Sequence, residues 1–152
     1  KTFYHGHSYT GNPLACAAGV AGLELFEKDD VIGNLPPKMA VIAEHIQKMN
    51  TMKYVGNARQ CGMLAGIELM HDKNLKIPFD STLLMAGGIC QTARKYGLIV
   101  RNIGDVIIFM PPLVSTVQQI EEMLSILEQA MQEVFEKVDL HSNIKFSDPC
   151  AF

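Results

Sequence analysis

The sequence predicts an α+β fold, in which a mostly antiparallel sheet carries its helices on one face. Three observations lead to this prediction. Several segments repeat apolar residues at helical spacing, the strand-like segments come in adjacent pairs around short glycine-containing turns, and 48% of the 152 residues are hydrophobic. Strands joined by a short turn pair antiparallel. A chain of this length and composition can bury the core of one domain.

The first element is expected to be a helix. Asn12 is a good N-cap, and Pro13 suits the first helical turn, where its missing N–H costs nothing. Gly19 and Gly22 keep one face of this helix small. That face fits either close packing against another backbone or subunit, or a tight contact within the domain. Residues 29–34 interrupt the helical pattern.

A second helix and a first pair of strands follow. The helix is expected over residues 35–49, where His45 lies beside the apolar stripe and is expected to be a partly exposed structural residue. Residues 54–61 and 63–69 predict two strands joined around Gly62, and hence an antiparallel pair.

A third helix and a second pair of strands come next. A polar, proline-marked loop at residues 71–80 leads to a helix expected from about Ser81 to Tyr96, with Gly97 as its C-terminal cap. Residues 98–101 and 106–110 predict two more strands, which end at a Pro-Pro pair.

The last helix is expected to begin with a capping box, in which Ser115 is the cap and Gln118 lies three residues later. Its apolar stripe is expected to pack on the sheet. The stripe consists of Val117, Ile120, Met123, Leu124, Leu127, Met131, Val134, Phe135 and Val138.

Charge and cysteine content narrow the functional classes. A net charge of −3 provides no electrostatic footprint for nucleic acid, and no apolar run is long enough to span a membrane. Cys16, Cys61 and Cys90 lie in apolar sequence and are expected to be small core residues in a reducing compartment, whereas Cys150 lies in a polar tail. We therefore expect a cytoplasmic protein.

The segment from Phe3 to Cys16 is the strongest candidate site, because glycines and hydroxyls lead directly into a helix start. Such an N-terminus presents unpaired N–H groups and partial positive charge, which suit a phosphate. A metal site at His5 and His7 is the rival interpretation, but two histidines are too few for zinc and no further ligand lies nearby. A site this close to residue 1 indicates a piece of a larger protein.

Arg101 is the second candidate, since it follows an apolar run and lies beside a glycine-containing turn. One interpretation is a bidentate clamp on a substrate carboxylate, which suits the planar guanidinium. The other is a solvated arginine paired with Asp105 across the turn.

Two blocks resemble class III pyridoxal-phosphate-dependent aminotransferases. They are HGHSYTGNPLAC at residues 5–16 and GLIVRNIGDVIIFMPPL at residues 97–113, and the resemblance extends to about residue 138. It implies the C-terminal small domain of a fold-type I transferase. Within the class, the blocks are most similar to members of biotin synthesis, which implies amino transfer from S-adenosylmethionine to 8-amino-7-oxononanoate.

The resemblance also implies roles for single residues. His7 and Ser8 would bind the cofactor phosphate of pyridoxal 5'-phosphate, while Gly6 and Arg101 would contact substrate. The loop at residues 5–11 would reach the active site of the partner subunit in a homodimer. Residues 1–28 would be this loop and a connector helix, 29–138 the small domain and 139–152 a tail.

The lysine that forms the Schiff base with the cofactor precedes this segment in the family, so no catalytic residue is expected in this chain and the chain alone is expected to be inactive. Two alternatives stay open. One is another class III enzyme acting on ω-amino acids, and the other is a non-catalytic α+β module for ligand binding or dimerisation.

Overall fold

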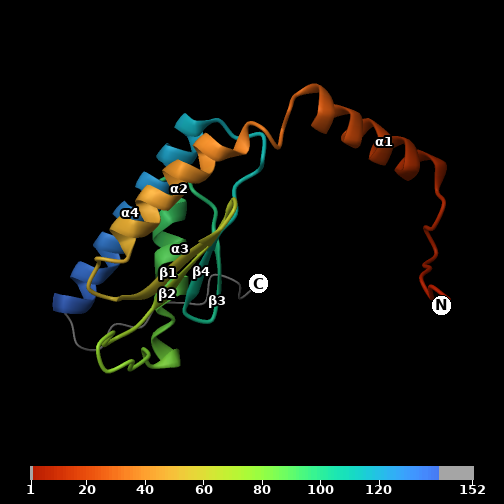
Figure 1. Cartoon of the computed structure of the whole chain (residues 1–152). Coiled ribbons are helices and arrows are strands. Elements are labelled where there is room, and N and C mark those ends of the chain that lie inside the picture. The colour runs from red at the N-terminus through yellow and green to blue at the C-terminus, as the bar shows by residue number, and fades with distance from the viewer. Residues whose placement is uncertain (1, 141–152) are drawn as a thin grey trace. The chain divides into compact units, whose positions relative to one another are not determined.

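The computed structural model describes residues 2–140 and divides into two compact units after Asn34 (Figure 1). The first unit holds one helix, and the second holds the sheet and the remaining helices. Cys150, which the sequence places in a polar tail, lies outside the described residues. Each unit is described by itself below.

The first unit contains α1 (Pro13–Lys28), which begins where the sequence predicts. Asn12 is the N-cap, and its side-chain Oδ1 accepts a hydrogen bond of 3.1 Å from the Ala15 N–H. Gly11 precedes the cap at φ +74°, a backbone conformation that glycine adopts without steric cost. The local signals of Asn12 and Pro13 are therefore sufficient to start this helix.

The second unit is an antiparallel sheet covered by helices, as predicted. Its strand order is β1-β2-β4-β3, and every neighbouring pair is antiparallel. The helices gather on one side of this sheet (Figure 1). Its elements are α2 (Leu35–Met49), β1 (Val55–Cys61), β2 (Leu64–Leu69), the short η1 (Ser81–Leu83), α3 (Met85–Lys95), β3 (Arg101–Ile103), β4 (Val106–Phe109) and α4 (Val117–Leu140).

The two faces of the sheet differ in burial. Along β2 and β4 burial alternates, so Ile67, Ile107 and Phe109 lie in the core whereas Gly66 and Ile108 are only partly covered. Alternation of this kind is the period-2 signature of a sheet with one covered face. The other face of the sheet is therefore open among the described residues.

The third helix departs from its predicted form. The segment splits into η1 and α3 at Leu84, whose backbone takes a left-handed conformation with φ +52°. The predicted end is confirmed: Gly97 has φ +91°, its N–H donates to Arg94 O, and the Leu98 N–H donates to Ala93 O. These two bonds form a Schellman motif, which satisfies the last carbonyls of the helix.

The strand predicted at residues 98–101 begins only at Arg101. The register pairs Arg101 with Ile108, so continuing the ladder backwards would set Leu98 opposite Pro111. Proline has no N–H to donate to a ladder. Leu98 is instead buried beyond the end of α3. Arg101 therefore stands at the start of β3 rather than at the end of a strand.

The stripe on α4 is confirmed as core, but its main contacts differ from the prediction. Ile120, Leu124, Leu127 and Met131 are fully buried, and α4 packs chiefly against α2 and α3 instead of directly on the sheet.

His45 is partly buried, as predicted, and its role is to join α2 to α4. Its Nδ1 lies 2.7 Å from Oε1 of Glu128, a buried carboxylate on α4 that also binds Lys48. These contacts compensate the carboxylate for the loss of water.

The capping box of α4 lies one residue later than predicted. The Gln119 N–H donates to Thr116 Oγ1 over 3.1 Å, and the Thr116 N–H donates to Gln119 Oε1 over 2.9 Å. Ser115 is buried just before the cap, and its N–H donates to Pro112 O. This turn after the two prolines shifts the helix start.

Thr116→Ala should therefore destabilise the fold by about 1 kcal/mol, the usual cost of losing an N-cap side chain. Urea unfolding followed by circular dichroism measures this change. Ser115→Ala should cost clearly less. A larger loss from Ser115→Ala than from Thr116→Ala would contradict the assignment.

Two of the three cysteines predicted to be core residues are not. Cys90 on α3 is buried, but Cys16 on α1 and Cys61 at the end of β1 are exposed. Cys16 lies on a helix that has no buried residue among those described, and Cys61 points to the open face of the sheet.

Candidate functional site

The candidate phosphate loop forms a compact turn at residues 7–10. The Thr10 N–H donates to His7 O over 3.0 Å, and the His7 N–H donates to Thr10 Oγ1 over 2.9 Å. The Tyr9 N–H donates to His7 Nδ1 over 3.2 Å. His7 thus shapes the turn with its ring, its carbonyl and its N–H.

Ser8 is the residue of this turn whose polar groups are available. Among residues 2–140, neither its hydroxyl nor its N–H has a hydrogen-bond partner, and the residue is exposed. The His7 N–H, in contrast, is already bound by Thr10. The turn can therefore offer an anion the N–H and the hydroxyl of Ser8, whereas the backbone N–H of His7 becomes available only if it gives up its bond to Thr10.

Gly6 lies in open surroundings. A Cβ built on it would meet no atom within 4 Å, so nothing among the described residues requires glycine there. Within the first unit, no packing contact therefore accounts for glycine at this position.

The rings of His5 and His7 contact each other. The rings of His5 and His7 lie edge to face with their centroids 6.0 Å apart. Within residues 2–140, no group of three or more histidine, cysteine or acidic side chains is placed to hold a metal ion. Over the same residues, no helix is both long and apolar enough to cross a membrane.

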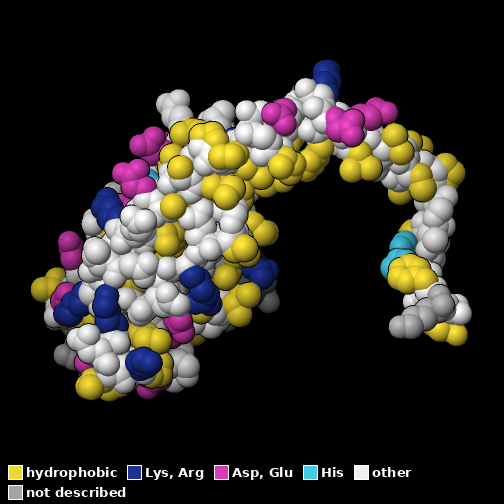
Figure 2. Space-filling view, in the orientation of Figure 1, with side chains coloured by type: hydrophobic (Ala, Val, Ile, Leu, Met, Phe, Trp, Pro, Cys, Tyr) yellow, Lys and Arg dark blue, Asp and Glu magenta, His cyan; other side chains and the backbone are white. Residues whose placement is uncertain are grey.

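The helix that follows the loop exposes its apolar side chains (Figure 2). Leu14 is 83% exposed and Leu23 is 71% exposed, and α1 contains no buried residue. Within the first unit, a Cβ on Gly19 or Gly22 would meet nothing within 4 Å, so no close packing there accounts for these glycines. Apolar surface of this extent is typical of a helix that packs against another protein surface.

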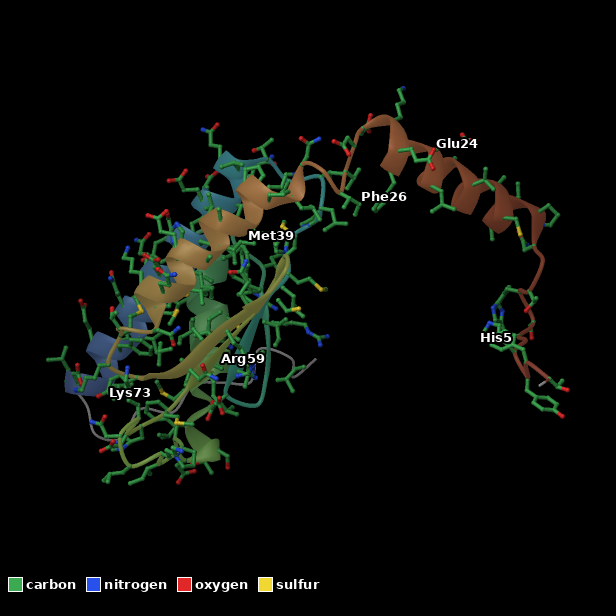
Figure 3. The ribbon with its side chains drawn as sticks, viewed as in Figure 1. His5, Glu24, Phe26, Met39, Arg59 and Lys73 are labelled. Carbon is green, nitrogen blue, oxygen red and sulfur yellow. The ribbon has the colours of Figure 1, made fainter. Side chains whose placement is uncertain are left out.

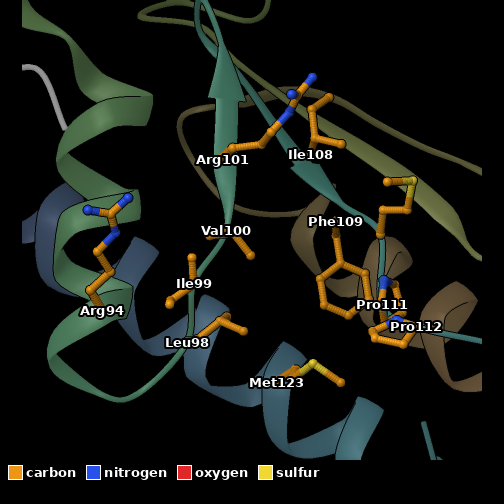
Figure 4. Close-up of a pocket in the computed structure, with 11 residues that line it drawn as sticks. Arg94, Leu98, Ile99, Val100, Arg101, Ile108, Phe109, Pro111, Pro112 and Met123 are labelled. Atoms are coloured by element: carbon orange, nitrogen blue, oxygen red, sulfur yellow. The ribbon is translucent and has the colours of Figure 1, made fainter. Parts of the chain in front are cut away.

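Arg101 lines a cavity of about 320 Å³ in the second unit (Figure 4). The Arg101 side chain extends from the start of β3 beside Ile108 of β4, while Arg94 of α3 lines another side of the cavity. The rest of the wall is largely apolar: Leu98, Ile99, Val100, Phe109, Met110, Pro111, Pro112 and Met123. A guanidinium above an apolar wall suits the carboxylate of an aliphatic molecule.

The alternative pairing of Arg101 with Asp105 is not found. Arg101 has no ion pair with any residue in 2–140, and the Asp105 carboxylate turns toward α3, where its Oδ1 accepts from the Ala86 N–H at 3.5 Å. Leu84 offers no side-chain cap to α3, so Asp105 partly fills that role from another element.

Partial burial raises the pKa of Asp105, against the lowering effect of the Ala86 N–H. A raised pKa means that the folded state binds the proton more tightly than the unfolded state does. Protonated Asp105 therefore stabilises the fold at low pH, and this stabilisation is lost as the pH rises from the ordinary pKa of aspartate through the raised pKa of Asp105.

Asp105→Asn should therefore be more stable than the unmodified chain at pH 7, by at most about 1 kcal/mol, because the amide accepts the same hydrogen bond without a charge. The advantage should shrink toward pH 3. Melting temperatures across this range measure it, with exposed Glu122→Gln as control. A variant that loses stability at pH 7 but not at pH 3 would refute the assignment.

Arg59 is a candidate that the sequence pattern did not single out. It lines a second cavity of about 580 Å³, together with Arg101. Strand alternation places Arg59 on the solvent-facing side of β1, but only the pairing of β1, β2, β4 and β3 brings it onto the same face as Arg101. Register of this kind is not readable from a single sequence.

A protein-family model and curated relatives both match this chain. The model of the Aminotransferase class-III family matches residues 1–131. The adenosylmethionine-8-amino-7-oxononanoate aminotransferase of Anoxybacillus flavithermus is 42% identical over 137 residues, which cover 90% of this chain and 30% of that protein. The protein of the same name from Geobacter sulfurreducens is 41% identical over 134 residues, covering 88% and 30%. This chain thus spans about 30% of the length of these relatives.

Solved aminotransferase structures also superpose on this chain. The adenosylmethionine-8-amino-7-oxononanoate aminotransferase from Methanocaldococcus jannaschii superposes with a TM-score of 0.81 at 38% identity, covering 87% of this chain and 30% of that chain. A PMP-bound aminotransferase from Vibrio fluvialis gives a TM-score of 0.84 at 28% identity, covering 90% and 30%. By its sequence over residues 1–131 and by its α+β fold, the chain belongs to the class III aminotransferase family.

Proposed function

We propose that this chain is the C-terminal part of an aminotransferase that transfers an amino group from S-adenosylmethionine to 8-amino-7-oxononanoate in biotin biosynthesis. The observation that carries the proposal is the identity of 41–42%, over about nine-tenths of the chain, to proteins named for that reaction. A γ-aminobutyrate transaminase from rice is 28% identical over a similar span. Proteins named for the biotin-pathway reaction reach higher identity, up to 42%, although the one from Staphylococcus aureus is 27% identical. The higher values favour the biotin-pathway reaction over an ω-amino-acid reaction.

The candidate loop fits the phosphate of pyridoxal 5'-phosphate, the cofactor of this family. Ser8 would hold the phosphate with its available N–H and hydroxyl, and His7 would add its N–H by exchanging the bond to Thr10. When bound, this cofactor supplies the electron sink that amino transfer requires. The lysine that anchors it would come from the part of the enzyme outside this chain.

Arg101 and Gly6 would bind the substrate. Arg101 presents a guanidinium that has no ion pair within residues 2–140, beside an apolar wall, which suits a carboxylate carried on an aliphatic chain such as 8-amino-7-oxononanoate. Gly6 has free space on its exposed side, which would allow a substrate to approach the backbone closely.

We further propose a homodimer in which the loop at residues 5–11 reaches the active site of the partner subunit. The exposed apolar side chains of α1, next to this loop, support the proposal, because a helix without buried residues needs a surface to pack against. Residues 1–28 would then be the phosphate loop and connector helix, 29–138 the small domain and 139–152 a tail.

The test is turnover by the full-length protein that contains this segment. With pyridoxal phosphate, it should convert 8-amino-7-oxononanoate to 7,8-diaminononanoate when S-adenosylmethionine is the amino donor. Ser8→Ala should raise the cofactor concentration needed for half-maximal activity, while the neighbouring exposed Tyr4→Phe should leave it unchanged. Turnover of ω-amino acids alone would refute the proposed substrate.

A further inference from the structure

The open face of the sheet carries two arginines in one cross-strand row. Arg59 on β1 pairs with Gly66 on β2, Gly66 pairs with Ile108 on β4, and Ile108 pairs with Arg101 on β3. Residues directly opposite one another on neighbouring strands project to the same face. Arg59 and Arg101 therefore face the same side, with one glycine and one isoleucine between them.

Arg59 lies on the sheet of the second unit (Figure 3). Gly66, on the neighbouring strand, leaves room for its side chain to lie across the sheet. A Cβ built on Gly66 would lie 4.0 Å from both Cζ and Nε of Arg59, so the guanidinium has moved over the neighbouring strand. Glu68 holds it there, with its Oε2 3.4 Å from Arg59 Nη1. Because adjacent strands lie about 4.8 Å apart, this orientation brings the guanidinium roughly one strand closer to Arg101.

The two arginines share the cavity of about 580 Å³. Apolar side chains supply much of its remaining wall: Leu64, Ala65, Ile103, Ile108 and Met110. Glu68 neutralises only part of the positive charge, since Arg101 has no ion pair within residues 2–140. A positively charged rim around an apolar floor selects a carboxylate that is attached to an aliphatic chain.

We propose that Arg59 is a second carboxylate-binding residue, so that the acid group of an aliphatic substrate lies between Arg59 and Arg101 and its chain lies over Ile108. The inference rests on the proposed function, in which Arg101 binds the substrate carboxylate. It adds a second guanidinium, positioned by Gly66 and Glu68, and it defines the ligand class as aliphatic monocarboxylates.

Titration of the purified chain with octanoate tests the proposal, with octanamide as the uncharged control ligand. The probes are the side-chain Nε–H NMR signals of Arg59 and Arg101. Octanoate should shift both signals and octanamide neither. Arg59→Gln should weaken octanoate binding about three- to tenfold, and Lys95→Gln, which lies away from the cavity, should not change it.

Gly66→Val provides a second variant, because its methyl groups would occupy the space that Arg59 crosses. It should weaken octanoate binding as Arg59→Gln does, with an unchanged circular dichroism spectrum. A shift at Arg101 alone, with normal affinity in Arg59→Gln, would overturn the role of Arg59 while the role of Arg101 stands. No shift at Arg59 up to the solubility limit of octanoate would also overturn it. The turnover assay tests the proposed function separately.

Discussion

Arg101→Ala in the full-length enzyme should raise the KM for 8-amino-7-oxononanoate about 10- to 100-fold, with a smaller effect on kcat. The guanidinium would hold a carboxylate that is distant from the reacting ketone carbon, so the contact would be equally strong in the ground state and in the transition state. Charge-assisted hydrogen bonds of this kind contribute about 1.5–3 kcal/mol. Steady-state kinetics with varied 8-amino-7-oxononanoate measure the change.

Two variants sharpen this test. Arg101→Lys keeps the charge but loses the planar fork, so it should recover only part of the lost affinity. Lys95→Ala removes an exposed positive charge that lines neither cavity, and it should leave the KM unchanged. An unaltered KM in Arg101→Ala would exclude this arginine from substrate binding.

Phe109→Ala should destabilise the second unit by about 3–5 kcal/mol, the usual cost of removing a large aromatic side chain from a packed core. Phe109 is 1% exposed and lies on β4, an inner strand of the sheet. The surrounding helices and strands cannot collapse fully into the space, so a cavity adds to the lost burial. Urea unfolding monitored by circular dichroism measures the loss.

The residue that follows β4 provides the control. Met110 is 71% exposed on the opposite side of the chain from Phe109, so Met110→Ala should change stability by less than about 0.5 kcal/mol. Equal losses in the two variants would show that β4 does not separate a covered face from an open one.

Much of the fold is predictable from the sequence where a signal and its consequence lie close together. Asn12 and Pro13 start α1, Gly97 ends α3, and the apolar repeat of residues 35–49 gives α2 its full length. Each of these depends on backbone groups within one or two turns of the residue concerned. The antiparallel pairing of β1 with β2 follows from the short turn at Gly62 for the same reason.

Predictions were wrong where a distant segment decides the outcome. Arg101 begins a strand rather than ending one, because Pro111 is the residue that Leu98 would have to pair with. Of the two interpretations left open for Arg101, the pairing with Asp105 is absent within residues 2–140, because Asp105 binds the Ala86 N–H of α3. Cys61 is exposed because its side of the sheet carries no helix in the second unit.

By itself, the sequence determined the family and the α+β class, and it singled out the loop as a candidate site, because these depend on residue types at fixed short spacings. The tertiary structure decided which polar groups are available to a ligand: the His7 N–H donates to Thr10 Oγ1, whereas the N–H and hydroxyl of Ser8 have no partner within residues 2–140. It also decided that Arg59 joins Arg101 on one face of the sheet. Both outcomes depend on hydrogen-bond partners and strand register, which are properties of the folded chain.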